Sequence, residues 1–138
     1  MAHPFHHALS SVKRWGGNPE DYLPIHDFFD ESKMCLADVR HRALRHHAEG
    51  IFLAERVFGA VITNSQGRLV PVRFIGEQHV QEDLGWIPTV KDWLQHLPLA
   101  RWMAHGGKLD LSPAERATGT VLIANTSCDA QQEIPRHG

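Results

Sequence analysis

The chain has 138 residues, of which 42% are hydrophobic and 22% charged, and its net charge is −2 when histidine is neutral. This length and composition are typical of one globular domain with a buried core. The nearly balanced charge argues against binding to nucleic acid or to a membrane through a general positive field. Because no apolar run reaches the roughly 20 residues of a membrane span and the start lacks a signal peptide's apolar core, we expect a cytoplasmic protein.

The first part of the chain is predicted to form two helices. Residues 4–15 carry apolar side chains at helical spacing and are followed by Gly16-Gly17, which indicates a helix with a defined end. Residues 18–21 resemble a helix start, but Pro24 is unfavourable inside a helix. This leaves two alternatives: a kinked second helix, or a short turn before a helix that begins near Leu23.

The third predicted helix is long and runs from about Glu31 to Phe58. Asp30 is expected to cap it, with Phe29 and Met34 in contact as a hydrophobic staple. The alternative is that Gly50 ends one helix and that a second begins at residue 51.

Small residues give this predicted helix a seam. Ala43, Gly50 and Ala54 share a face that another helix backbone can approach closely. A second copy of the chain packed on this seam would form a homodimer.

The periodicity then changes. Residues 60–63 and 69–75 are rich in strand-forming residues and flank a turn at 64–67, which predicts a β-hairpin. Short helices are expected at about 77–84 and from Thr89, and residues 107–138 are predicted to be a polar, mobile tail. The predicted fold is therefore α+β and mainly α: three N-terminal helices, one β-hairpin at about 60–75 and short C-terminal helices, forming a single domain over residues 1–106.

Eleven histidines are the most informative feature of the composition. Histidine is the commonest metal ligand and changes charge near neutral pH. The helical pattern turns one histidine of each predicted N-terminal helix inward, and a buried imidazole needs a partner. We predict that zinc or another divalent transition metal is held by His7, His26, His46 and His47.

Carboxylates near these histidines are candidates for a remaining coordination position: Asp27, Asp30 and Glu49. A second group, in which His79 shares a helix face with Glu82 and Asp83, is interpreted as an exposed, hydrated acidic turn rather than a metal site. His26-Asp27 is also the dipeptide that metal-dependent phosphohydrolases of the HD superfamily use as ligands. If the protein is an enzyme, a metal-dependent hydrolase is the expected class, but the sequence favours a protein without catalytic activity.

Several segments together resemble an uncharacterised family, a domain of unknown function found in small bacterial and tailed-phage proteins. They are residues 6–11, 15–17, 22–26, 40–51 and 87–94, and the resemblance extends over residues 4–103. It implies a prophage or another mobile element as the context, and no activity.

Two functions remain open at this point. The first is binding of a divalent transition metal through the histidines. The second is an accessory protein of a phage or mobile element that binds a host protein, with histidines that serve only the structure. An exposed aromatic patch including Trp86 or Trp102 would be the mark of the second.

Overall fold

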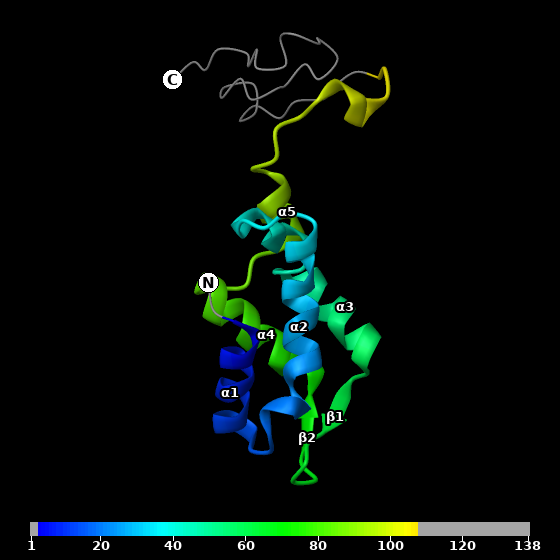
Figure 1. Cartoon of the computed structure of the whole chain (residues 1–138). Coiled ribbons are helices and arrows are strands. Elements are labelled where there is room, and N and C mark those ends of the chain that lie inside the picture. The colour runs from blue at the N-terminus through cyan, green and yellow to red at the C-terminus, as the bar shows by residue number, and fades with distance from the viewer. Residues whose placement is uncertain (1–2, 108–138) are drawn as a thin grey trace. The chain divides into compact units, whose positions relative to one another are not determined.

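The computed structural model describes residues 3–107. The chain divides into two compact units, residues 1–94 and 95–138. The described part of the second unit contains one 3-10 helix, η4 (Arg101–Ala104). The predicted tail begins at residue 107, and its residues 108–138 lie outside the described part of the chain. The first unit contains the helices and the hairpin discussed below (Figure 1).

Helix α1 (Pro4–Trp15) has the predicted bounds. Its proline occupies the first turn, where a missing N–H costs no hydrogen bond, and the ring of His3 accepts a hydrogen bond from the Phe5 amide. The helix ends at Gly16, whose φ of 81° favours glycine.

The ambiguity around Pro24 resolves in favour of a short turn and a later helix. Residues Pro19–Asp21 form the 3-10 helix η1, and α2 begins after Tyr22 and covers Leu23–Asp30. Pro24 therefore lies in the first turn of α2, where it interrupts no hydrogen bond.

The prediction of one long helix from Glu31 to Phe58 is wrong. The chain instead forms the 3-10 helices η2 (Glu31–Met34) and η3 (Val39–Leu44), followed by α3 (Ala48–Phe58). Two side chains cap new starts: Asp38 accepts from the Arg40 amide, and His47 accepts from the Gly50 amide. Met34 is 88% exposed, so the predicted staple does not bury it.

Gly50 lies inside α3, and neither predicted explanation of it holds. A Cβ at this position would lie 1.9 Å from the Arg45 carbonyl oxygen. The glycine is therefore required by the close approach of the preceding turn. The seam is also not continuous, because Ala43 belongs to η3.

The predicted hairpin is present but shorter. Strands β1 (Val61–Thr63) and β2 (Leu69–Pro71) pair antiparallel, and Ile62 faces Val70 across the ladder. Residues 72–75, predicted as strand, belong to α4 (Val72–Leu84). The reason is Pro71, which cannot donate to a ladder but precedes a helix without cost; Val72 and Ile75 are then buried on the helix.

The last helix of the first unit is α5 (Val90–Leu94). The Thr89 amide and hydroxyl both donate to the Asp92 carboxylate, and the Asp92 amide donates to the Thr89 hydroxyl. This reciprocal capping is the predicted start signal at Thr89.

The core lies where α1, α2, α3 and α4 meet. Helix α4 contacts each of the other three, and all four lie alongside one another in Figure 1. The buried apolar side chains come from these helices, the hairpin and the residue before α2: Ala8, Tyr22, Ile25, Phe28, Phe29, Ile51, Ala54, Val70, Val72, Ile75 and Val80. The protein is therefore mainly helical with one two-stranded hairpin, as the sequence predicts. Among residues 3–107, no helix is long and apolar enough to cross a membrane.

The close contact at Gly50 gives a test of the broken third helix. Gly50→Ala ordinarily stabilises a helix by about 1 kcal/mol, but here the added methyl collides with the Arg45 carbonyl, and we expect a loss of about 1–3 kcal/mol. The free energy of unfolding in guanidinium chloride measures it. Gln81→Ala, at an exposed position of α4, is the control and should change stability by less than about 0.5 kcal/mol. Stabilisation by Gly50→Ala would support a continuous helix instead.

Candidate metal centre

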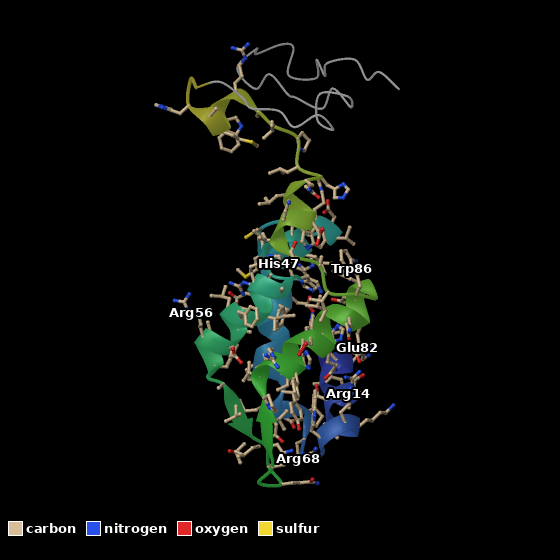
Figure 2. All side chains as sticks on the ribbon, turned by 180° about the vertical axis from the view of Figure 1, so that it is seen from behind. Arg14, His47, Arg56, Arg68, Glu82 and Trp86 are labelled. Atoms are coloured by element: carbon tan, nitrogen blue, oxygen red, sulfur yellow. The ribbon has the colours of Figure 1, made fainter. Side chains whose placement is uncertain are left out.

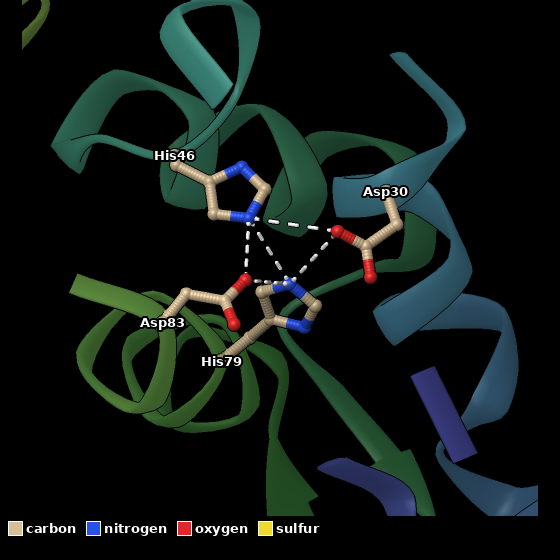
Figure 3. A group of neighbouring side chains, drawn as sticks. All are labelled: Asp30, His46, His79 and Asp83. Carbon is tan, nitrogen blue, oxygen red and sulfur yellow. Dashed lines mark hydrogen bonds and ion pairs between the residues drawn. The ribbon is translucent and has the colours of Figure 1, made fainter. Parts of the chain in front are cut away.

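Four acidic and histidine side chains from three segments meet inside the first unit (Figure 3). Asp30 is the last residue of α2, and His46 lies in the turn before α3. His79 and Asp83 lie one turn apart on α4. One ligand atom of each lies within 4.8 Å of those of the other three. We call these four residues the Asp–His cluster.

The distances within the Asp–His cluster fit one small cation. The His46 Nε2 atom lies 3.0 Å from Asp83 Oδ2 and 3.2 Å from His79 Nε2. The His79 Nε2 atom lies 3.3 Å from Asp83 Oδ2 and 3.5 Å from Asp30 Oδ1. The remaining measured separation, from His46 Nε2 to Asp30 Oδ1, is 3.7 Å. A tetrahedral ion with ligands at about 2.0–2.1 Å needs ligand atoms about 3.3–3.4 Å apart.

Asp30 is the least satisfied member of the cluster. Its side chain is 5% exposed, and neither oxygen accepts a hydrogen bond from any described residue. Its other oxygen, Oδ2, forms an ion pair with Lys33 Nζ at 3.8 Å, a distance too long for a hydrogen bond. A buried carboxylate without donors is costly, so a cation beside Oδ1 would compensate it.

The two cluster carboxyls are ionised. Burial favours the neutral form of Asp30, but its interactions with His79, Lys33 and His46 keep its pKa below the ordinary value. Burial likewise opposes ionisation of Asp83, yet contacts with His46, His7 and His79 hold its pKa far below the ordinary range. Both acids therefore offer charged oxygens at neutral pH.

His46 is neutral in this environment. Burial is the largest influence and outweighs the Asp83 contact, so that the pKa of His46 falls to about 4. The neutral imidazole is the form that binds metals. The turn that carries His46 is held in place by Trp93, whose ring N–H donates to the His46 carbonyl.

His7 supports the cluster from α1. Its Nδ1 atom lies 2.7 Å from Glu82 Oε1, and its Nε2 atom lies 3.3 Å from Asp83 Oδ1. Burial lowers the pKa of His7, but its contacts with Asp83 and Glu82 outweigh burial and raise it above the ordinary value. Arg42 also lies 3.6 Å from Asp83 Oδ1. His7 and Arg42 therefore hold the Asp83 oxygen that faces away from the cluster.

His26 lies behind His79. Its Nδ1 atom is 3.0 Å from His79 Nδ1, and its Nε2 atom is 2.9 Å from the Ser11 hydroxyl. Burial, with repulsion from His79 and His7, lowers the pKa of His26 to about 2. His26 is therefore a neutral partner of a cluster histidine, with both nitrogens already engaged.

His47 lies at the start of α3 (Figure 2) and does not belong to the Asp–His cluster. Its Nδ1 atom accepts from the Gly50 amide, and its Nε2 atom lies 3.1 Å from both the Ala43 and Leu44 carbonyl oxygens. Both ring nitrogens are engaged by the backbone. The structure gives His47 the role of a helix cap.

The structure thus brings three of the four histidines predicted as ligands to one place, and His46 is the one of them that lies within the Asp–His cluster. His46 belongs to the Asp–His cluster, whereas His7 and His26 contact its members and His47 lies elsewhere. Asp30, one of the carboxylates named from sequence, is also in the cluster.

The interpretation of His79, Glu82 and Asp83 as an exposed acidic turn is wrong for two of the three residues. His79 is fully buried, and the Asp83 side chain is 2% exposed. The signal was the i, i+4 spacing of His79 and Asp83. Whether this spacing indicates an exposed turn or a buried site depends on which side of α4 faces α2, and the sequence does not determine that side.

The His26-Asp27 dipeptide does not present two ligands to one ion. His26 is buried and Asp27 is exposed, because adjacent helical residues point about 100° apart. The geometry gives the HD-hydrolase interpretation no support.

Comparison with known proteins places the chain in a family. A family model described as a domain of unknown function (DUF6915) matches residues 2–103. The chain belongs to this family. Searches of curated proteins and of solved structures found no match.

The role of His47 can be tested separately from the cluster. His47→Ala removes the cap of α3 and should lower the free energy of unfolding by about 1 kcal/mol. His47→Asn, which keeps an acceptor for the Gly50 amide, should recover much of that loss. Neither variant should change metal content measured by elemental analysis, and a loss of metal in both would contradict the placement of His47 outside the centre.

Proposed function

We propose that this protein binds one divalent transition-metal ion through the Asp–His cluster. The observation that carries the proposal is the buried, ionised Asp30 carboxylate, which accepts no hydrogen bond from the described residues and faces two imidazole nitrogens. An ion there would compensate two carboxylates at once. It would also connect the end of α2 and the turn before α3 to α4.

Zinc is the ion we propose. Two imidazoles and two carboxylates suit zinc and related transition metals, whereas magnesium and calcium prefer oxygen ligands alone. The five measured separations of 3.0–3.7 Å straddle the tetrahedral edge that zinc requires. Cys35, the free cysteine in the described part of the chain, is exposed and does not belong to the cluster.

The proposed role of the ion is structural. Structural zinc sites are closed by four protein ligands, whereas catalytic sites keep a position open for water. The Asp–His cluster offers four ligands in a buried place. A hydrolase would need Asp30 to yield its position to water from the adjoining groove of about 440 Å³, which Asp30 lines with His3, Asp27 and Lys33 among others.

Binding to a host protein is the second candidate function. Trp86 is 55% exposed and Trp102 69% exposed, as this function requires of at least one of them. The resemblance to proteins of phages and mobile elements motivates it. Recovery of one stoichiometric partner by metal-free protein would favour this function over the first.

Zinc titration of chelator-treated protein tests the proposal. Calorimetry should give one zinc per chain for the wild type, and saturation at 100 times Kd should stabilise the fold by about 2.7 kcal/mol. His46→Ala and Asp30→Asn should each lose this binding, because each removes a ligand.

The matched control for this titration is His6→Ala, which removes an exposed histidine beside His7. It should bind zinc like the wild type. Absence of binding by the wild type, or equal binding by His46→Ala, would contradict the proposal.

The metal-free protein offers a further test at Asp30. Asp30→Asn removes a carboxylate that the fold holds ionised, with a pKa below its ordinary value, so in excess chelator the variant should be less stable than the wild type by about 1 kcal/mol. Asp27→Asn, on the exposed side of the same helix, should change the free energy of unfolding by less than about 0.5 kcal/mol. Equal or greater stability of Asp30→Asn would contradict an Asp30 carboxylate that is ionised and partly compensated in the metal-free protein.

A further inference from the structure

A chain of hydrogen bonds leads from Gln78 on α4, through Ser11 on α1 and His26 on α2, to the back of His79. Its first member is Gln78. The Gln78 Nε2 atom lies 2.9 Å from the His7 carbonyl oxygen and 3.0 Å from Glu82 Oε1. Both partners are acceptors, so the amide nitrogen must lie on this side. The amide oxygen therefore faces the Ser11 hydroxyl.

Ser11 is the second member and is fully buried. Its Oγ atom lies 2.6 Å from Gln78 Oε1, a distance that requires a proton between the two oxygens. The amide oxygen has none, so the single hydroxyl proton of Ser11 is directed to Gln78. The Ser11 oxygen can then only accept from its other close side-chain neighbour, His26 Nε2, at 2.9 Å.

The protons on the two following rings are then determined. His26 carries its proton on Nε2. Its ring is fully buried and hydrogen-bonds only to Ser11 and His79 among the described residues, so no carboxylate compensates a second proton and Nδ1 keeps a lone pair. His79 Nδ1, 3.0 Å away, must be the donor. The opposite nitrogen of His79, Nε2, is the atom that faces Asp30, His46 and Asp83.

We propose that Ser11, oriented by Gln78 and acting through His26, is a positioning residue that fixes the tautomer of His79 and leaves its Nε2 lone pair free for the metal. The effect on metal affinity rests on the proposed function, whereas the assignment of the tautomers does not. Ser11 touches no cluster atom and works through the intervening ring.

The opposite direction of these hydrogen bonds would weaken metal binding. If Ser11 donated to His26, His26 would donate from Nδ1 to His79, and a neutral His79 would carry its proton on Nε2. That proton would occupy the space between the two carboxylates and His46. Hydrogen bonds behind a ligating histidine commonly set its tautomer and orientation, and here Gln78 sets the direction.

The first experiment measures the wild type without metal. Long-range ¹H–¹⁵N correlation spectra of ¹⁵N-labelled, chelator-treated protein distinguish the two neutral histidine tautomers. We expect the Nε2–H form for His26 and the Nδ1–H form for His79. The Nε2–H form for His79 would overturn the proposal, whether or not the protein binds zinc.

The second experiment compares Ser11→Ala with Ser10→Ala. The Ser10 variant removes a neighbouring hydroxyl that takes no part in this series of hydrogen bonds. Ser11→Ala removes the acceptor of His26 Nε2–H, so both rings should show mixed tautomers and zinc affinity should fall about 10–100-fold. Ser10→Ala should keep the wild-type tautomers and affinity. Wild-type tautomers in Ser11→Ala would overturn the role of Ser11.

The two proposals fail in different ways. Wild-type protein with the assigned tautomers but no zinc binding would contradict the proposed function and support the tautomer assignment. Zinc binding by a protein whose His79 has the opposite tautomer before zinc is added would support the proposed function and contradict the tautomer assignment.

Discussion

The arrangement of the first unit depends on the burial of two ionised carboxylates beside two imidazole rings. Asp30 and Asp83 lie on different helices and face the same ring nitrogens of His46 and His79. Charge in such a place is stable only when it is compensated. Asp83 has several partners for this purpose, including His7 and Arg42, whereas Asp30 accepts no hydrogen bond from the described residues. A cation bound at the cluster, as proposed, would complete this arrangement.

Helices α2 and α4 carry residues of both the apolar core and the Asp–His cluster. On α2, Phe29 is fully buried next to Asp30, and its ring stacks on His79 with centroids 5.0 Å apart. On α4, Val80 is buried next to His79. Packing of α2 on α4 therefore brings the carboxylate of one helix to the histidine of the other, and the core fixes the positions of the ligand atoms before any ion binds.

The sequence was most informative where a local signal dominates. Gly16 and Thr89 mark helix ends that can be predicted from their chemistry, and the inward direction of His26 follows from helical spacing. The break before α3 could not be predicted, because it depends on His47 acting as a cap and on the Arg45 carbonyl approaching Gly50. For a related reason, only part of the Asp–His cluster could be predicted from the sequence. Which side of α4 is buried depends on where the hairpin ends, and this decides whether His79 and Asp83 are exposed or central.

X-ray absorption at the zinc edge of the zinc-loaded protein tests the central claim most directly, because it reports the ligands of the ion itself. The account predicts a first shell of two nitrogens and two oxygens at about 2.0–2.1 Å, with scattering from two imidazole rings and no sulfur. A sulfur contribution, a shell of oxygens alone or a spectrum of hydrated zinc would contradict it.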